Sequence, residues 1–470
     1  MTDTLEAYPG FWTLVFRKLR TPSVFVFWAI VVFSALTFKF WINWCPSPFT
    51  NDVDQYYSYL VAKFIHNDLN FKFPHHYWLI EAPNGQLVPK VTMGMAIMYL
   101  PFFVIGNNIA YAFDYNGEGY SAPYMWCIHL GSILYVLIGL WYCRKTLLHY
   151  FSEWITALTM VLLLFGTNLF FYTYKESEMP HSYLFLLFSL FVYHVVRWQH
   201  SGRLKHVYIF AFIAGFISLI RPTECLVLLF PLLINVATFR DFKDRLAFLA
   251  GLKWKLLLII LLFIIPILPQ LIFWKVQTGQ FFFFSYGSQE GFFFRDPKFY
   301  SVLFGYRKGW LLYTPIMWFS VLGMVWMFFK WRKMFFAVTV YFLVNLYLIS
   351  SWWDWGYGGA YGMRALVHSY ALLVIPFAFF IRSFIMLGKQ LILKIVSTLV
   401  ILSVGAFFCY LTIFQTWMFK NSLMHWDSMT REAYWFVFLK KDFTGGDRVY
   451  LETLFKHPDY EAMRQGKRDE

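Results

Sequence analysis

The sequence predicts an all-α protein that crosses a membrane many times, and three observations support this fold class. Of its 470 residues, 59% are hydrophobic and only 14% are charged, whereas soluble domains carry about 25% charged residues. Apolar runs of about 17 to 22 residues, long enough to cross a hydrocarbon core of about 30 Å, recur from Pro22 to Gln415. The basic residues lie mostly between these runs, as the positive-inside rule expects. The net charge of +14 therefore indicates membrane orientation and not nucleic acid binding.

The basic clusters predict a path through the membrane, because an even number of crossings must separate clusters that lie on the same side. The clusters are Arg17, Lys18 and Arg20; Arg144 and Lys145; Arg197, Arg203 and Lys205; Arg240, Lys243, Arg245, Lys253 and Lys255; Lys330, Arg332 and Lys333; and Arg382, Lys389 and Lys394. Placing all of them in the cytoplasm predicts about eleven transmembrane helices: 22–42, 122–143, 154–172, 182–197, 207–221, 222–239, 254–274, 309–329, 334–350, 364–382 and 395–415. The N-terminus then lies in the cytoplasm. Residues 1–415 form the membrane module, with a large outer loop at 43–121, and residues 416–470 form a short extracytoplasmic tail.

One apolar run does not fit this path. Residues 91–113, "VTMGMAIMYLPFFVIGNNIAYAF", are long enough to cross, but a crossing there would move Arg144 and Lys145 to the outer side. Pro101 and the glycines of this run are compatible with a bent helix that lies in the outer interface or re-enters the membrane. The alternative, a twelfth crossing, remains open.

Two acids begin an expected interfacial helix in the first outer loop. In "NDVDQYYSYLVAKF" the apolar residues recur at helical spacing, which predicts an amphipathic helix on the outer face. Asp52 and Asp54 fall in its first turn, where the helix dipole favours acids by roughly 0.3 to 1 kcal/mol. The pair is therefore either a helix-capping feature or a functional site.

The same loop carries further ionisable residues that bear on the choice between a helix cap and a functional site. His75, His76 and Glu81 follow the helix, and Lys90 lies directly before the 91–113 run. A lysine at this depth either extends to lipid phosphates without specificity or holds the phosphate of a lipid-linked substrate.

Two further outer turns carry candidate site residues. "YTYKESEMPHSY" contains Glu178 and His181, which are either ordinary loop polarity or part of a substrate site. "SLIRPTECL" places Arg221 between apolar residues, a costly position that indicates either a function or a buried ion pair with Glu224. The phenylalanine-rich segment 277–315 is too interrupted to span. It is either an aromatic floor that receives a lipid tail or covers a cavity, or the interfacial aromatic belt common to membrane proteins.

The last outer loop, "SSWWDWGYGGAYGMRALVHSY", combines aromatic, glycine and charged residues. Its candidate substrate-binding residues are Trp352, Trp353, Asp354, Trp355, Tyr357 and His368. Tryptophan and tyrosine rings stack on the apolar faces of sugars, and glycines let a ligand approach the backbone. Arg364, at an expected helix N-terminus, suits a phosphate or pyrophosphate. The alternative is an ordinary interfacial aromatic belt.

The order of these motifs resembles the GT-C superfamily of membrane glycosyltransferases, in particular the bacterial protein mannosyltransferase and aminoarabinose transferase (family 39-like) branch. The resemblance covers about residues 10–415 and rests on "NDVDQYY", "VPKVTMG", Glu178 in "KESEMPHS", and "WWDWGYGGAYGMRAL". The paired Asp-Glu of the family is Asp-Val-Asp-Gln here, so the choice between Asp52 and Asp54 stays open. The resemblance implies a bacterial-type inner membrane, an extracytoplasmic active site and a polyprenyl-phosphate sugar donor.

The expected reaction is an inverting transfer of a sugar to a lipid, protein or glycan acceptor. Asp54, by preference over Asp52, acts as general base, and Lys90 with Arg221 or Arg364 stabilises the leaving phosphate. The sequence establishes no cofactor and leaves a divalent cation open; if Mg²⁺ or Mn²⁺ takes part, Asp52, Asp54 and Glu178 are its candidate ligands. The alternatives are a lipid or glycan transporter or flippase without transferase activity, and a non-catalytic sugar-binding protein.

Overall fold

The computed structural model describes residues 21–44, 49, 51–73, 79–287, 290–388 and 390–468. The sequence predictions for Arg17, Lys18, Arg20, His75, His76 and Lys389 fall outside these residues. Within them the chain is helical except for loops and one antiparallel hairpin, in which β1 (Leu79–Glu81) pairs with β2 (Leu87–Pro89).

Long apolar helices form the body of the molecule and identify an integral membrane protein. Five described helices are long and apolar enough to cross a membrane: α2 (Pro22–Trp44), α4 (Gly94–Ala112), α5 (Ala122–Leu147), α17 (Arg332–Ser351) and α19 (Leu391–Lys420). Shorter apolar helices pack beside them: α6 (Glu153–Phe165), α9 (Leu204–Ile220), η2 with α10 (Pro222–Leu228, Leu229–Leu233), η3 with α16 (Pro315–Met317, Trp318–Lys330) and α18 (Tyr370–Ile385). The all-α membrane class is therefore confirmed, while the number of eleven crossings stays a prediction.

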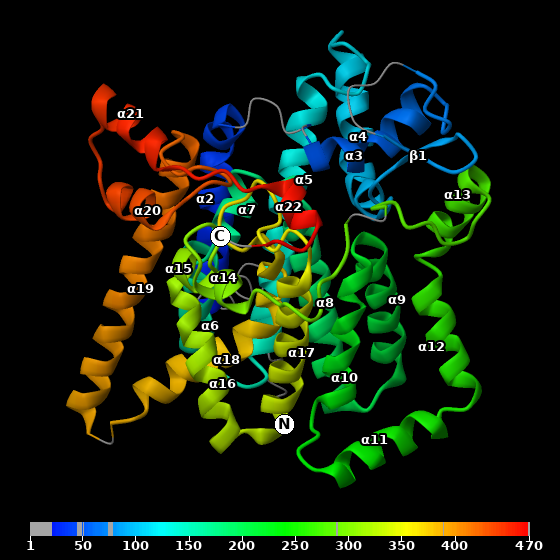
Figure 1. The fold of residues 1–470 in the computed structure, drawn as a ribbon. Helices are drawn as coiled ribbons and strands as arrows, with labels where there is room; N and C mark the ends of the chain where they lie inside the picture. The colour runs from blue at the N-terminus through cyan, green and yellow to red at the C-terminus, as the bar shows by residue number, and fades with distance from the viewer. Residues whose placement is uncertain are drawn as a thin grey trace, which may run out of the picture.

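The segments expected outside the membrane gather at one end of this bundle. Figure 1 shows α3 (Asn51–Leu60), β1 and α13 (Leu268–Thr278) at the same end as α20 (Arg431–Val437), α21 (Gly445–Leu454) and α22 (Tyr460–Arg464). The amphipathic helix expected from Asn51 onward is thus present, and it continues into η1 (Val61–Ile65). We call this end of the molecule the loop end.

Helix α4, the run whose crossing was in doubt, begins where α9 finishes. The Thr92 hydroxyl donates to the carbonyl of Leu219, and a Cβ added to Gly94 would lie 2.9 Å from the backbone nitrogen of Ile220. From there α4 runs along the first half of α5, where Tyr135 donates to the carbonyl of Met98 at 3.0 Å. Helix α4 therefore continues toward the loop end beyond α9 and does not lie alongside it. A non-spanning role for α4 agrees with this placement and stays a prediction.

The expected crossing at 254–274 is broken in the structure. Helix α12 (Trp254–Ile264) ends before Pro266, and α13 starts again with Pro269 in its first turn. Pro266 has no backbone N–H to donate to the preceding turn and its ring crowds the carbonyl four residues earlier, which explains the break. The sequence analysis also missed α11 (Phe239–Gly251), which begins with a Thr238/Asp241 capping box, lies at the opposite end of the bundle and meets α12 at 90°.

Two close helix contacts hold the elements that carry the site. A Cβ on Gly139 of α5 would lie 3.2 Å from the Cα of Leu186 in α8 (Pro180–Ser201), so only glycine allows this approach. A Cβ on Gly323 of α16 would likewise overlap the backbone of Pro376 in α18. Small residues at such contacts let helices pack closely in a membrane, where backbone proximity replaces the hydrophobic effect as the source of stability.

Candidate functional site

The three cations predicted to bind phosphate converge at the loop end. Lys90 follows β2, Arg221 terminates α9, and Arg364 begins η4 (Arg364–Leu366), so three distant segments contribute. Burial raises the pKa of Tyr56 in α3, and Arg221, Asp52 and Arg364 all act on its hydroxyl electrostatically. Their common influence on one side chain places these charges around Tyr56. Lys90 joins this group through Tyr286, because its Nζ atom lies 4.8 Å from that ring centroid and Arg221, Asp52 and Arg364 also act on the pKa of Tyr286. We call Lys90, Arg221, Arg364 and Asp52 the open cluster.

Arg364 is the buried member of the open cluster. Its Nη2 atom lies 3.3 Å from Oδ2 of Asp52, and only 10% of its side chain is exposed, against 48% for Asp52. Burial opposes the charge of Arg364, but Asp52, Tyr172 and Glu176 outweigh it and raise the pKa of the guanidinium. Arg364 is therefore a permanent cation that leaves the Asp52 carboxylate accessible.

Arg221 is the member whose guanidinium N–H groups are not used by the described protein residues. Its guanidinium carbon lies 5.8 Å from the ring centroid of Tyr357. Among the described residues its side chain forms no hydrogen bond or ion pair. An arginine between apolar segments without a protein anion is suited to an anionic ligand.

Lys90 is already paired. Its Nζ atom lies 2.7 Å from a carboxylate oxygen of Glu290 and 4.8 Å from the ring centroid of Tyr286. Ser285 also donates to the backbone carbonyl of Lys90. The phenylalanine-rich segment therefore contacts the open cluster through Glu290, a role that the sequence analysis did not assign.

The two acids of α3 face opposite ways. Asp52 lies beside Arg364, whereas Asp54 is 3% exposed. Burial, Tyr120, Tyr124 and Asp54 together raise the pKa of Tyr57, which places the Asp54 carboxylate on the packed side of the helix. Residues two apart in an α-helix point about 200° apart, so only one of the two can face the open cluster.

Glu178, the predicted second acid, is committed to a partner elsewhere. It is 2% exposed, and one of its carboxylate oxygens lies 2.8 Å from Nδ1 of His129 in α5. Burial would raise the pKa of Glu178, but His129 and Ser177 lower it below its ordinary value. Within the described part of the chain no three His, Cys, Asp or Glu side chains could together hold a metal ion. The structure therefore does not assemble the predicted ligand set of Asp52, Asp54 and Glu178.

A neighbouring acid lies closer to the open cluster. Glu176, two residues earlier, acts electrostatically on Arg364, and burial raises the pKa of its carboxyl. In the sequence both glutamates lie in one short loop. The path of the chain between α7 (Leu169–Tyr174) and α8 gives them different surroundings.

The ion pair considered for Arg221 does not form. Glu224, in the 3-10 helix η2, instead lies 3.1 Å from Nε2 of His368. The ring of His181 stacks parallel to that of His368 at 6.2 Å, and both histidines are fully buried. Glu224 and the two histidines therefore form a buried group of their own, and Arg221 remains in the open cluster without this carboxylate as a partner.

The last outer loop, residues 350–370, which we call the aromatic loop, divides into a buried and an accessible half. Trp353 lies under Arg464 at 5.0 Å, Trp355 lies under Arg307 at 5.2 Å, and both are largely or fully buried. Trp352 and Tyr357 remain partly exposed, and Trp352 packs edge-to-face on Tyr286 at 5.6 Å. Of the predicted stacking residues, only these two border the open cluster on an accessible side.

Asp354 organises this loop. Its carboxylate accepts the backbone N–H of Gly356 at 3.2 Å and that of Gly358 at 2.6 Å, and burial raises its pKa. The loop passes Tyr357, Gly358 and Gly362 with positive φ angles of 59°, 63° and 59°. Asp354 therefore shapes the turn that leads to Arg364.

The chain has distant structural likeness to solved proteins. No protein-family model and no curated protein sequence matches the chain. Among solved structures, the archaeal oligosaccharyltransferase AglB from Archaeoglobus fulgidus, in complex with an inhibitory peptide and a dolichol-phosphate, superimposes with a TM-score of 0.47 at 12% identity. The alignment covers 92% of this chain and 60% of AglB, so the chain spans about 60% of the length of that protein. At this level of likeness, the function has to be inferred from the residues of this chain.

Proposed function

We propose that this protein is a GT-C-like membrane glycosyltransferase that transfers a sugar from a polyprenyl-phosphate donor to an acceptor hydroxyl. The observation that carries the proposal is the open cluster, in which Arg364 contacts a half-exposed carboxylate, Asp52, and two further cations from separate segments lie on the neighbouring rings of Tyr286 and Tyr357. A lipid-linked phosphate would reach such a site from the bilayer. The carboxylate supplies the second group that a glycosyl transfer needs.

The cations would bind and stabilise the departing phosphate. Arg221 has donors that the described protein groups do not use, and Arg364 keeps its charge next to Asp52. Fixed cations placed where negative charge develops lower the barrier, because they need no rearrangement during the reaction. Lys90 would join them once the phosphate competes with Glu290 for its ammonium group.

Asp52 is the base that this geometry favours, although the sequence analysis preferred Asp54. The acceptor oxygen attacks the anomeric carbon, the bond from that carbon to the phosphate oxygen breaks, and the hydroxyl proton passes to Asp52. Attack from the face opposite the leaving group inverts the anomeric configuration. Asp54 is 3% exposed and faces the packed side of α3, where an acceptor has no access.

The finer features of the proposal come from the predicted membrane path and from the family resemblance. The active site and C-terminus lie on the extracytoplasmic face of a bacterial-type inner membrane, and the enzyme belongs to the family 39-like branch. A lipid, protein or glycan accepts the sugar, and Trp352 and Tyr357 border the sugar-binding side. No step is assigned to a divalent cation.

The decisive experiment measures transfer by the purified protein in lipid nanodiscs. A set of short-chain polyprenyl-phosphate sugars serves as donor with pooled acceptors, and release of polyprenyl phosphate is followed by mass spectrometry. We expect release by the wild-type protein, and a loss of at least about 100-fold in Asp52→Asn. Glu118→Gln, an exposed acid in the same outer loop, is the matched control and should retain full activity.

Two results would contradict the proposal. Release that is equal in wild type and Asp52→Asn would exclude the carboxylate from the chemistry. Movement of intact donor across a vesicle membrane without release of polyprenyl phosphate would instead support the flippase alternative.

A further inference from the structure

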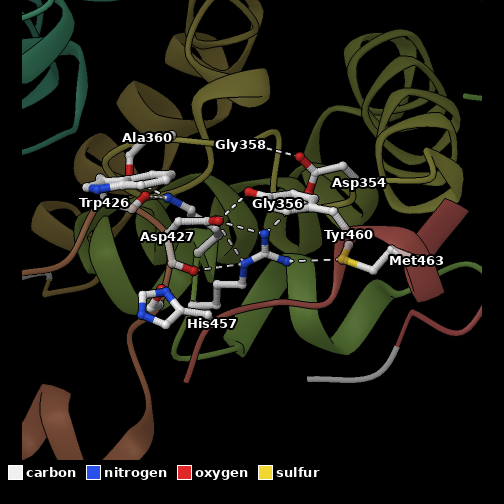
Figure 2. A network of polar contacts seen from close by, with 12 residues as sticks. Asp354, Gly356, Gly358, Ala360, Trp426, Asp427, His457, Tyr460 and Met463 are labelled. Atoms are coloured by element: carbon white, nitrogen blue, oxygen red, sulfur yellow. Dashed lines mark hydrogen bonds and ion pairs between the residues drawn. The ribbon is translucent and has the colours of Figure 1, made fainter. Parts of the chain in front are cut away.

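A second basic cluster lies at the loop end and contacts the C-terminal segment, residues 421–468. It consists of Arg307 and Lys308, between α14 (Phe299–Phe304) and α15 (Trp310–Tyr313), and Asp427 of the segment. We call these three residues the closed cluster. Figure 2 shows residues of the last outer loop, Asp354 to Ala360, together with Asp427 and other residues of the C-terminal segment in one network of polar contacts.

Lys308 joins the aromatic loop to the C-terminal segment. It is fully buried, and its Nζ atom donates to the carbonyl of Ala360 at 2.6 Å and to the carbonyl of Trp426. The backbone N–H of Ala360 donates to the same Trp426 carbonyl at 3.0 Å. One ammonium group and one amide thus fix the loop and the segment at a single point.

Arg307 holds the same two elements one residue earlier. Its Nη2 atom lies 2.7 Å from Oδ1 of Asp427 and 3.5 Å from Oδ1 of Asp354. Tyr460 of α22 donates to the other oxygen of Asp427. The side chain of Asp427 is 2% exposed, so this ion pair is shielded from water.

The loop leads directly from this fixed point to the open cluster. The hydroxyl of Tyr172 accepts the N–H of Tyr361 at 3.1 Å and donates to its carbonyl at 3.2 Å. Arg364 follows three residues later and contacts Asp52. A displacement at Ala360 would therefore be passed along a short, strongly bonded stretch to the Arg364 guanidinium.

We propose that Arg307 and Lys308 are positioning residues that lock the C-terminal segment onto the aromatic loop and thereby hold Arg364 at Asp52. The inference rests on the proposed function for its catalytic meaning, but the lock itself is a structural claim about this chain. It makes the C-terminal segment a working part of the site, although no residue of that segment belongs to the open cluster.

The chemistry of the closed cluster favours this role over simple packing. Apolar side chains of equal volume would stabilise a buried contact as well as or better than ions do, so buried ion pairs are weak evidence for stability alone. Hydrogen-bonded ions do specify one arrangement, because each donor must meet its acceptor at a fixed distance. Active-site groups require such fixed placement, and it is supplied by the residues that support them.

The test combines hydrogen exchange with steady-state kinetics of the full chain in nanodiscs. Lys308→Met keeps the length of the side chain and removes its donors, and Arg307→Lys keeps the charge and removes the planar fork. Lys441→Met, an exposed lysine in the C-terminal segment, is the matched control. In both cluster variants we expect faster amide exchange across residues 356–364 and a fall of about 10- to 100-fold in kcat/KM for the donor. The control should change neither quantity.

The readouts separate the two proposals. If exchange at 356–364 increases while no variant and no wild-type protein transfers sugar, the lock stands and the proposed function fails. If exchange at 356–364 stays at the wild-type rate in both Arg307→Lys and Lys308→Met, the lock is overturned whatever the activity. Should Lys308→Met fail to fold, the milder Arg307→Lys decides by the same two measurements.

Discussion

The open cluster and the closed cluster contain the same kinds of residue at the same end of the molecule, yet they use them differently. Each contains arginine, lysine and one aspartate that contacts an arginine. The Asp427 side chain of the closed cluster is 2% exposed, and Arg307 and Lys308 bond to protein groups from several elements. The Asp52 side chain of the open cluster is 48% exposed, and Arg221 bonds to no other described residue.

This difference indicates where a ligand belongs. A buried charge whose partners are all protein groups is costly to disturb and gains nothing from a ligand. A cation between apolar segments with unused donors is costly to keep unless something else binds it. The location of unused donors, and not the local density of charge, is therefore the basis on which we propose a ligand for the open cluster and a supporting role for the closed cluster.

The largest expected effect tests whether the open cluster is chemical. Asp52→Asn should lower kcat by about 100- to 10,000-fold, the range typical of a lost general base. The unfolding midpoint should fall less than in Asp427→Asn, because the Asp52 side chain is half exposed even though its partner Arg364 is buried. Asp54→Asn should show the reverse pattern, a lowered midpoint with a smaller loss of kcat, since it alters a buried group. Single-turnover assays and thermal unfolding in nanodiscs measure the two quantities. A larger loss of kcat in Asp54→Asn would return the role of base to that residue.

The closed cluster should respond in stability instead. Asp427→Asn leaves the Arg307 guanidinium buried without its main carboxylate, which costs about 3 to 5 kcal/mol when a buried pair is broken. The free energy of unfolding, measured by denaturant titration in mixed micelles, should fall by that order. Asp459→Asn changes an exposed acid that caps α22 of the same segment, and it should cost no more than about 1 kcal/mol. A loss in Asp427→Asn as small as that of Asp459→Asn would remove the distinction between the clusters.

A smaller effect is expected at the unpaired arginine. Arg221→Met should weaken binding of a polyprenyl phosphate by about 10- to 100-fold, the value of one or two charge-assisted hydrogen bonds, and should leave the unfolding midpoint unchanged. Arg221→Lys should recover part of the affinity, because it restores the charge without the guanidinium fork. Titration with a fluorescent polyprenyl phosphate measures both. Unchanged affinity in Arg221→Met would mean that the phosphate binds elsewhere.

The sequence predicted the elements better than it predicted their partners. Hydropathy and helical periodicity identified the apolar bundle and the helix that starts at Asn51, because these patterns depend only on neighbouring residues. The sequence also placed Arg221 and Arg364 on one face, and both act on Tyr56 in the structure, while their role in phosphate binding stays a prediction. The break at Pro266 could have been predicted from the proline itself, and the amphipathic α11 from its capping box.

Partner choice depends on distances between segments that no local pattern encodes. Glu224 pairs with His368 and not with Arg221 because η2 turns its carboxylate away, and Glu178 pairs with His129, a residue 49 positions earlier. Trp353 and Trp355 looked suited to sugar stacking, but arginines near the C-terminus and before α15 cover them. The closed cluster was missed altogether, since "YRKGW" and "MHWDS" are ordinary loop sequences until the fold brings them together.

The smallest expected effect uses the titration of the closed cluster itself. Burial lowers the pKa of Lys308 to about 7, from an ordinary value of 10.5. Between these values the unfolded chain holds a proton that the folded chain has released, so stability rises with pH in this window and is independent of this lysine below it. The gain cannot exceed about 1.4 kcal/mol per pH unit.

The unfolding midpoint of the wild-type protein should therefore rise modestly between pH 7 and 8.5, below the range in which unfolded tyrosines ionise. In Lys308→Met the rise should disappear, and an equal rise there would assign it to another group. The open cluster should show no matching dependence, because Arg221 and Arg364 stay charged throughout this range.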